Sequence, residues 1–241
     1  ERRDFAVHPK LDQLTNIAVF VCCVLVSLLV GIRLWNEYLG GESSAAMAPS
    51  VENLESANLI LSAKDAASLG AHTANMVMVE FSDFECPFCG RYARETFPEL
   101  KREFIDSGKL KYMFRNLPLP IHTNATKAAE AAECALRQRR YWEMHGRLFA
   151  NQQALRIDDL VAHAAVLQLD TDEFRVCLEG ATASRIADDL AEAQRLGVQS
   201  TPSFLVGQLQ PNGQVRVLRR IKGAQPYSVF RTELGELVDR R

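Results

Sequence analysis

Residues 76–90 read MVMVEFSDFECPFCG, and they give the clearest indication of the fold in the sequence. Its first part (76–81) is a short apolar run, which is typical of a buried β-strand. Apolar residues at helical spacing follow and predict a helix over 91–105. Pro87 would stand in the first turn of that helix, where its missing N–H loses no hydrogen bond. The stretch therefore predicts a strand, a short loop and a helix that begins at a Cys-Pro-Phe-Cys motif.

The start of a helix is a place where a pair of cysteines becomes reactive. Free backbone N–H groups and the positive end of the helix dipole stabilise a thiolate on Cys86. A lowered thiol pKa makes Cys86 both an available nucleophile and a good leaving group. Cys89 lies one turn later on the same face, from where it can attack a mixed disulfide on Cys86 and release a bound substrate. The two thiols thus form a reversible two-electron couple.

A zinc site and a purely structural disulfide are the alternatives for this pair. Zinc would need two more ligands, usually a second Cys-x-x-Cys or a pair of histidines. The other cysteines near the domain, Cys134 and Cys177, are isolated and have no histidine at ligand spacing. A disulfide that closes so tight a loop adds little chain-entropy stabilisation. We therefore expect redox chemistry that uses no metal and no cofactor.

With this motif the chain resembles the DsbA family of thioredoxin-fold proteins. Residues 79–89 (VEFSDFECPFC) are specific to the subgroup with phenylalanine or tyrosine inside the Cys-Pro-x-Cys motif, and residues 197–207 (GVQSTPSFLVG) are a second match. The resemblance covers the chain from about Met76 to the C-terminus. It implies an α/β thioredoxin fold with an inserted helical domain, which fits the helical pattern of residues 121–196.

The resemblance also implies which residues face the cysteine pair. Thr201 and Pro202 would belong to a loop whose cis-proline faces the active site, although a trans proline that begins a strand is the alternative. The Thr201 backbone could then pair with an extended substrate near Cys86. Pro87 and Phe88 inside the motif, and Thr201 beside it, would tune the reduction potential.

Acidic residues surround the motif as well. Glu80 corresponds to a buried acid that is thought to relay protons to the cysteines in this family, and strand alternation points it away from the face of Val79. A lone buried carboxyl group would have a raised pKa, which suits a relay. The alternative is an ordinary surface strand residue. Asp83 and Glu85 also flank the motif and should oppose thiolate formation somewhat.

The two cysteines of the helical region remain to be assigned. Cys177 shares a predicted helix face with Phe174 and Leu178. In an oxidising compartment, two leftover cysteines in one domain tend to pair. We predict a structural disulfide between Cys134 and Cys177, which would stabilise the fold by about 4 kcal/mol in the chain-entropy model. Two separate buried thiols are the alternative.

The N-terminal part contains an uncharged apolar segment over residues 17–32. With its apolar flanks (14–35) it reaches roughly the 20 residues that a membrane-spanning helix needs. A cleaved signal peptide is the alternative, but the first small-x-small site, at Ala46 and Ala48, lies far beyond the apolar segment. We therefore predict an uncleaved transmembrane anchor over residues 14–35.

Basic residues set the orientation of such an anchor. Arg2, Arg3 and Lys10 precede it, and only Arg33 lies near its other end. We therefore expect a single-pass protein of the bacterial cytoplasmic membrane with its redox domain on the periplasmic side. The predicted organisation is a cytoplasmic N-terminus (1–13), the anchor (14–35), a tether and N-terminal extension (36–75) with weak helical character over 53–74, and the redox domain (76–241).

Composition excludes some functions. Apolar residues make up 47% and charged residues 24% of the 241 residues, which is an ordinary globular composition with enough apolar side chains for a core. The net charge is −2, and no basic stripe is present that could neutralise phosphates. A nucleic-acid binder is therefore not expected.

Three functions stay open. The favoured one is a dithiol oxidase that introduces disulfides into reduced or unfolded secreted proteins and is reoxidised by a quinone-linked membrane protein of the DsbB or VKOR type. The second is a reductase or isomerase that keeps the same pair reduced; Thr201 resembles the isomerases, but the segment before the first strand is short for their dimerisation domain. The third is a binding module or chaperone without catalysis, against which the intact Cys-Pro-Phe-Cys motif argues.

Overall fold

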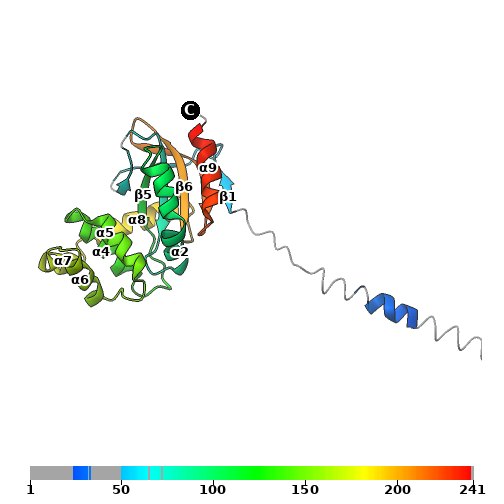
Figure 1. Cartoon of the computed structure of the whole chain (residues 1–241), viewed down its shortest axis with the longest axis horizontal. Coiled ribbons are helices and arrows are strands. Elements are labelled where there is room, and N and C mark those ends of the chain that lie inside the picture. The colour runs from blue at the N-terminus through cyan, green and yellow to red at the C-terminus, as the bar shows by residue number, and fades with distance from the viewer. Residues whose placement is uncertain (1–23, 32, 34–49, 65, 72, 240–241) are drawn as a thin grey trace, which may run out of the picture. The chain divides into compact units, whose positions relative to one another are not determined.

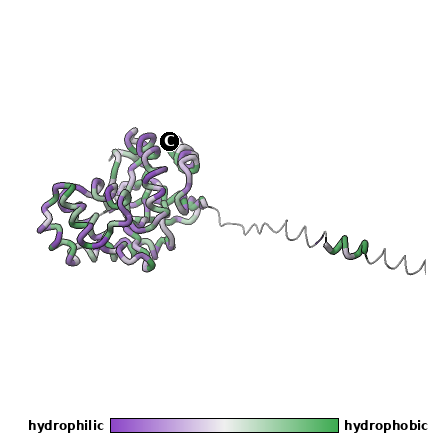
Figure 2. The backbone as a smooth tube through the Cα atoms, turned by 60° about the horizontal axis from the view of Figure 1, so that its bottom comes forward, coloured by the Kyte–Doolittle hydropathy of each residue, from purple (hydrophilic) through white to green (hydrophobic). Residues whose placement is uncertain are grey.

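The computed structural model describes residues 24–31, 33, 50–64, 66–71 and 73–239 of the chain. Two compact units are present, residues 1–48 and residues 49–241. In the first unit, residues 24–31 form a helix with exposed apolar side chains, and Figure 2 shows them as mostly hydrophobic. None of the described helices is long and apolar enough to cross a membrane. Most of the predicted anchor (14–35) lies outside the described residues, so the anchor stays a prediction.

The second unit is built on a seven-stranded sheet (Figure 1), whose path runs β1-β7-β6-β4-β5-β3, with β2 also paired to β7. Its strands are β1 (Val51–Asn53), β2 (Ile60–Ser62), β3 (Ala67–Leu69), β4 (Met76–Ser82), β5 (Leu110–Asn116), β6 (Ser203–Leu209) and β7 (Gln214–Lys222). The central strand β4 is parallel to β5 and antiparallel to β6. All seven residues of β4 are buried, because both faces of the sheet are covered.

One group of helices packs on the sheet, and a second group is inserted between β5 and β6. The first consists of α2 (Pro87–Glu95), α3 (Phe97–Leu100), the π-helix η1 (Lys101–Ile105) and α9 (Tyr227–Asp239). The second consists of α4 (Ala125–Arg137), α5 (Tyr141–Ala150), α6 (Ile157–Val166), α7 (Thr171–Leu178) and α8 (Ala183–Arg195). Figure 1 shows α4–α7 gathered at one end of the domain, away from α9. The α/β class with a helical insertion is thus confirmed.

Strand alternation divides the core into two layers. Val77 and Val79 belong to one apolar cluster, which the end of α8 closes. Met76 and Met78 belong to another, between the sheet and α2, α3, η1 and α9. A third cluster fills the helical insertion and includes both Cys86 and Cys89. The cysteine pair therefore lies where the sheet layer meets the insertion.

The N-terminal extension differs from the sequence-based prediction. Instead of weak helical structure over 53–74, it forms β1, β2 and β3, which pair with β7 and β5 along the edges of the sheet. These three strands therefore belong to the same sheet as β4. Each of these strands has three residues, which is too short for an alternating pattern to appear in the sequence. Pairing with an existing edge decides their structure.

The predicted helix over 91–105 is also divided. Helix α2 ends at Glu95, a new helix begins at Phe97, and a π-helical turn follows from Lys101. Pro98 stands in the first turn of α3, where it cannot donate a backbone hydrogen bond to the preceding helix. The proline therefore allows α3 to begin but prevents α2 from continuing through it.

Candidate active site

Cys86 is the residue that immediately precedes helix α2. Its backbone is extended (φ −70°, ψ 122°), and Pro87 occupies the first turn of the helix, as the sequence predicts. The Cys86 N–H donates to the Asp83 carbonyl at 3.1 Å, and the Cys86 carbonyl accepts from Gly90 N–H at 3.1 Å. The thiol therefore stands at the positive end of the helix dipole, among N–H groups without helical partners.

The two thiols of the motif differ strongly in acidity. The pKa of Cys86 is lowered to about 5, first by the Cys89 thiol and then by Thr201 and the backbone N–H groups of Cys89 and Phe88, while burial opposes the shift. Burial raises the pKa of Cys89 well above its ordinary value, and the Cys86 and Glu80 charges add to the rise. Near neutral pH the reduced pair therefore carries one thiolate, on Cys86, and a protonated Cys89.

The loop before β6 faces this thiolate. The Thr201–Pro202 peptide bond is cis. In its thiol form, Cys86 Sγ donates to the Thr201 carbonyl oxygen at 3.7 Å. The structure thus brings together three of the residues that the sequence singled out.

Glu80 lies in the core beneath the cysteine pair. Its side chain is on the Met76 and Met78 side of β4 and only 1% exposed, which excludes a surface role. The Tyr112 hydroxyl donates to Oε2, whereas Oε1 has no hydrogen-bond partner among the described residues. Burial raises the pKa of Glu80 to about 8, although Ser82 lowers it in part. Glu80 therefore holds a proton at neutral pH and lies close enough to influence Cys89.

Phe88 is the exposed member of the motif. Its side chain is 56% exposed, and the Arg91 guanidinium lies over its ring at 5.3 Å from the centroid. The other intervening residue, Pro87, is also exposed. The motif thus presents an aromatic ring to solvent directly beside the reactive sulfur.

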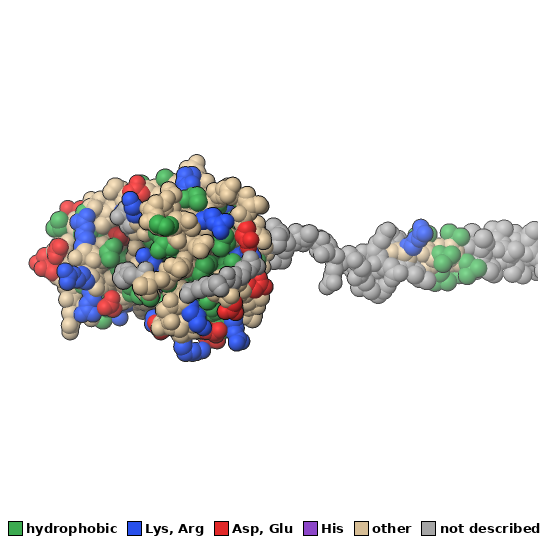
Figure 3. Space-filling view, turned by 90° about the horizontal axis from the view of Figure 1, so that it is seen from above, with side chains coloured by type: hydrophobic (Ala, Val, Ile, Leu, Met, Phe, Trp, Pro, Cys, Tyr) green, Lys and Arg blue, Asp and Glu red, His purple; other side chains and the backbone are tan. Residues whose placement is uncertain are grey.

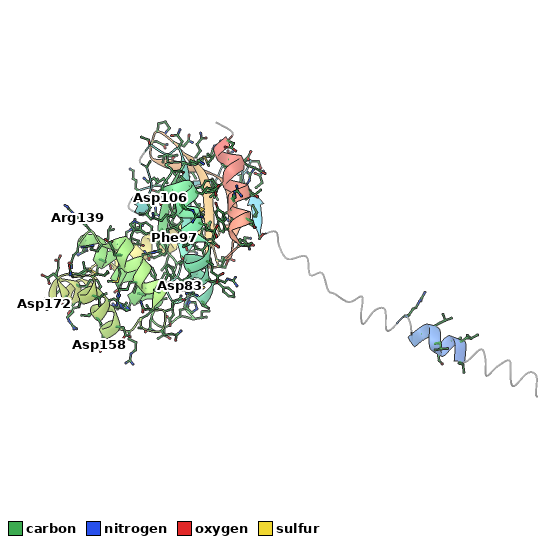
Figure 4. All side chains as sticks on the ribbon, viewed as in Figure 1. Asp83, Phe97, Asp106, Arg139, Asp158 and Asp172 are labelled. Atoms are coloured by element: carbon green, nitrogen blue, oxygen red, sulfur yellow. A yellow bond between two sulfur atoms is a disulfide. The ribbon has the colours of Figure 1, made fainter. Side chains whose placement is uncertain are left out.

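Two acids that were expected to oppose the thiolate are instead bound by the loop that leads into α4. Asp83 Oδ2 accepts from Leu119 N–H at 2.8 Å and lies 2.7 Å from His122 Nδ1. Glu85 Oε2 accepts from the backbone N–H of Asn124 at 2.6 Å. Figure 4 labels Asp83 at the junction between the sheet and the helical insertion. These contacts reduce the repulsion that the two carboxylates would otherwise exert on Cys86.

Gln152, just after α5, was missed by the sequence analysis. Its side-chain amide donates to the carbonyl oxygens of Phe84 (2.9 Å) and Cys86 (2.8 Å) and so holds the loop that carries the nucleophile. Gly90 makes room for it, because a Cβ atom there would lie 2.0 Å from Gln152 Oε1. No local pattern could indicate this contact, since the partners are more than sixty residues apart.

Cys134 of α4 and Cys177 of α7 form a disulfide with a Cα–Cα distance of 5.8 Å. Cys86 and Cys89 are free thiols in this structure. Within the described residues, no group of three or more histidine, cysteine or acidic side chains is arranged to hold a metal ion. The zinc alternative thus finds no ligand set in that part of the chain.

The sequence model of the family described as "Thioredoxin" matches residues 62–217. Among solved structures, alpha-DsbA1 of Wolbachia pipientis superposes with a TM-score of 0.62 at 25% identity, covering 73% of this chain and 92% of that one. Oxidised BdbD of Bacillus subtilis gives a TM-score of 0.63 at 24% identity, with 72% and 93% covered. A thioredoxin-like oxidoreductase of Silicibacter pomeroyi gives 0.58 at 24% identity, with 73% and 93% covered. The fold is therefore that of DsbA-like thiol–disulfide oxidoreductases.

Curated relatives match over part of their length. The Na(+)/H(+) antiporter NhaA 3 of Salinispora tropica is 39% identical over 150 residues, which cover 61% of this chain and 22% of the antiporter. The NhaA 1 antiporter of Salinispora arenicola has the same identity and coverage. This chain thus spans about a fifth of the length of these relatives, and the ion transport in their names does not follow for it.

Proposed function

The chain belongs to the thioredoxin family, and from that premise we propose that it is a dithiol oxidase, which donates a Cys86–Cys89 disulfide to reduced protein substrates. The observation that carries the proposal is the stabilised thiolate of Cys86, whose pKa is about 5. A redox pair whose reduced form is stabilised in this way has an unstable disulfide, which is readily passed on.

The chemistry follows from the asymmetry of the pair. A substrate thiolate attacks Sγ of Cys86 in the disulfide form, the Cys86–Cys89 bond breaks, and Cys89 leaves as a thiolate. The high pKa of Cys89 means that this thiolate takes up a proton, which the protonated Glu80 carboxyl group would supply in this scheme. A second substrate thiolate then attacks the substrate sulfur of the mixed disulfide and releases Cys86 as a thiolate. Two electrons have passed from the substrate to the protein.

Pro202 and Thr201 position the substrate in this scheme. Pro202 has no N–H, and the Thr201 carbonyl beside Cys86 can accept a hydrogen bond from an extended polypeptide. Exposed Phe88 adds an apolar contact next to the reactive sulfur. Recognition would thus rest on backbone and on general hydrophobicity, which suits unfolded substrates of differing sequence.

The compartment and the partners belong to the same proposal. A dithiol oxidase needs an oxidising compartment, where the Cys134–Cys177 bridge would also persist. We therefore propose a periplasmic redox domain, held by the predicted anchor over 14–35 and reoxidised by a quinone-linked membrane protein. Attachment of a reporter enzyme after residue 241 tests the orientation: a periplasmic reporter should be active and a cytoplasmic one inactive.

The first experiment is the equilibrium of the full chain with glutathione buffers of graded ratio. A potential well above that of the glutathione pool would support the oxidase, whereas one near or below that of thioredoxin would favour the reductase direction. Refolding of a reduced protein whose activity needs disulfides gives the second readout. Cys89→Ser should accumulate a mixed disulfide through Cys86, and Cys86→Ser should form none. If Cys86→Ser supported refolding of the reduced protein as well as the wild type does, the protein would be acting as a non-catalytic binding module.

A further inference from the structure

The buried side chain of Asp83 makes several contacts beside the nucleophile. It has no exposed area, and its Oδ1 accepts from Glu85 N–H at 2.8 Å. Its Oδ2 accepts from Leu119 N–H and lies 2.7 Å from His122 Nδ1. Its own carbonyl accepts from Cys86 N–H. Asp83 therefore fixes the backbone of the nucleophile and the loop 117–122 at once.

A buried carboxylate at this position needs a compensating charge. Three anionic groups meet here when the protein is reduced, namely Asp83, Glu85 and the thiolate of Cys86. Of these, the carboxylate of Glu85 is held by the backbone N–H and the side chain of Asn124. Asp83 lies three residues before the thiolate, and the His122 ring, which carries a positive charge when protonated, is in contact with it. Like charges this close would disfavour the thiolate unless one of them were neutralised.

The electrostatics of His122 agree with this geometry. Burial lowers its pKa, but Asp83, the thiolate of Cys86 and Glu85 together raise it above the ordinary value. An interaction between two titrating groups is mutual, so a protonated His122 must in turn favour the thiolate of Cys86. Its effect adds to the larger ones of Cys89, Thr201 and the helix N–H groups.

We propose that His122, held by Asp83, is a positioning residue for Cys86, whose protonated ring neutralises the buried carboxylate beside the nucleophile and so strengthens the protein as an oxidant. This inference rests on the proposed function of Cys86. It predicts that oxidising strength declines as His122 loses its proton, because the reduced, thiolate form then loses a stabilising charge. The loop after β5 thus takes part in the redox site.

The direct test is an NMR titration of the His122 ring in the full, reduced chain and in Cys86→Ser, which has no thiolate. We expect a higher pKa of His122 in the wild type. The reciprocal test is a titration of Cys86 followed by the thiolate absorbance: His122→Gln should raise its apparent pKa by about half a unit, which is a roughly threefold decrease in the acid dissociation constant. His122→Lys, which keeps the charge, should restore most of it.

A double-mutant cycle of Asp83→Asn and His122→Gln distinguishes the effect of the Asp83 charge from a general structural effect of changing His122. Without the Asp83 carboxylate, His122→Gln should have a smaller effect on Cys86 than it has in the wild type. Equal pKa values of His122 in the wild type and Cys86→Ser would overturn the proposal, even if a His122 variant failed to fold. If the titrations behave as expected but no disulfide is donated to substrates, the proposed oxidase function fails and this coupling stands.

Discussion

Sγ of Cys86 lies 3.7 Å from the carbonyl oxygen of Thr201, although 115 residues separate them in the chain. The contact joins the start of α2 to the loop before β6 across the whole helical insertion. It places the reactive sulfur against the backbone of the loop that contains the cis-proline.

The redox state should set the stability of the protein in a pH-dependent way. The pKa of Cys86 is lowered from 9.0 to about 5 on folding, so the thiolate stabilises the reduced fold above the unfolded pKa, and this stabilisation is lost as pH falls from 9 to 5. The disulfide form has no such group. We expect a higher urea midpoint for the reduced than for the oxidised protein at pH 7. The difference should shrink toward pH 4, and a constant difference would contradict it.

Glu80 should affect stability with the opposite sign. Its folded pKa of about 8 lies above the ordinary value of 4.5, so the folded protein binds the proton more tightly. The contribution of Glu80 to the free energy of unfolding is therefore fully present below pH 4.5 and is lost as pH rises toward 8. The loss is up to about 5 kcal/mol, at 1.36 kcal/mol per pKa unit. Glu80→Gln should remove this decline.

Urea unfolding of the wild type and Glu80→Gln at pH 5 and pH 9 measures this decline. The stability of the variant relative to the wild type should be greater at pH 9 than at pH 5. Glu233→Gln, a carboxyl group that lies outside the core, serves as the matched control and should show no such gain. Parallel curves for wild type and Glu80→Gln would show that the carboxyl group is ionised in the fold throughout.

The effect of Gly90→Ala on the free energy of unfolding should change sign when Gln152 is removed. Alanine is normally the better helix former by roughly 1 kcal/mol, but a Cβ at Gly90 would displace the Gln152 side chain. Gly90→Ala should therefore destabilise the wild type. Loss of the two hydrogen bonds of Gln152 should cost about 1–3 kcal/mol and slow the reaction of Cys86.

In a Gln152→Ala background the obstruction is gone, and Gly90→Ala should become neutral or stabilising. Denaturant unfolding of the four proteins gives the comparison. Gly235→Ala in α9, where a Cβ meets no atom within 4 Å, is the control for helix propensity alone. The same effect of Gly90→Ala in both backgrounds would mean that Gln152 does not occupy the space above Gly90.

The Cys134–Cys177 bridge should support the fold and leave the redox chemistry intact. It closes a separation of 43 residues, for which the chain-entropy model gives about 4 kcal/mol. Replacement of both cysteines by alanine should lower the free energy of unfolding by roughly that amount. The glutathione equilibrium of Cys86 and Cys89 should stay unchanged at a temperature where the variant is folded. A shifted potential would show that the bridge also affects the redox site.

Surface charge gives little further guidance. Acidic and basic side chains are interspersed over the face shown in Figure 3, in agreement with the small net charge of the chain.

Local sequence determined the elements that carry the chemistry. The apolar run of β4, the Cys-Pro-Phe-Cys motif and the helical pattern of α2 are all contiguous, and each depends on short-range rules of burial, proline geometry and periodicity. Glu80 was identified through the family resemblance, and alternation along β4 indicated only on which face of the strand it lies. Thr201 and Pro202 were found through a family resemblance, since a threonine-proline pair alone does not indicate its partner.

Tertiary structure decided the rest. Strands β1, β2 and β3 exist because the edges of β7 and β5 offer hydrogen bonds to segments too short to show a pattern. Only folding brings together the elements that make three of the contacts at the site. These are the contacts of Tyr112 with Glu80, of Gln152 with the Cys86 loop and of His122 with Asp83. The fold also sets which groups hold protons, because the pKa of a side chain depends on its burial and on neighbouring charges in space. The sequence therefore identified the reactive sulfur, and the fold determined its acidity.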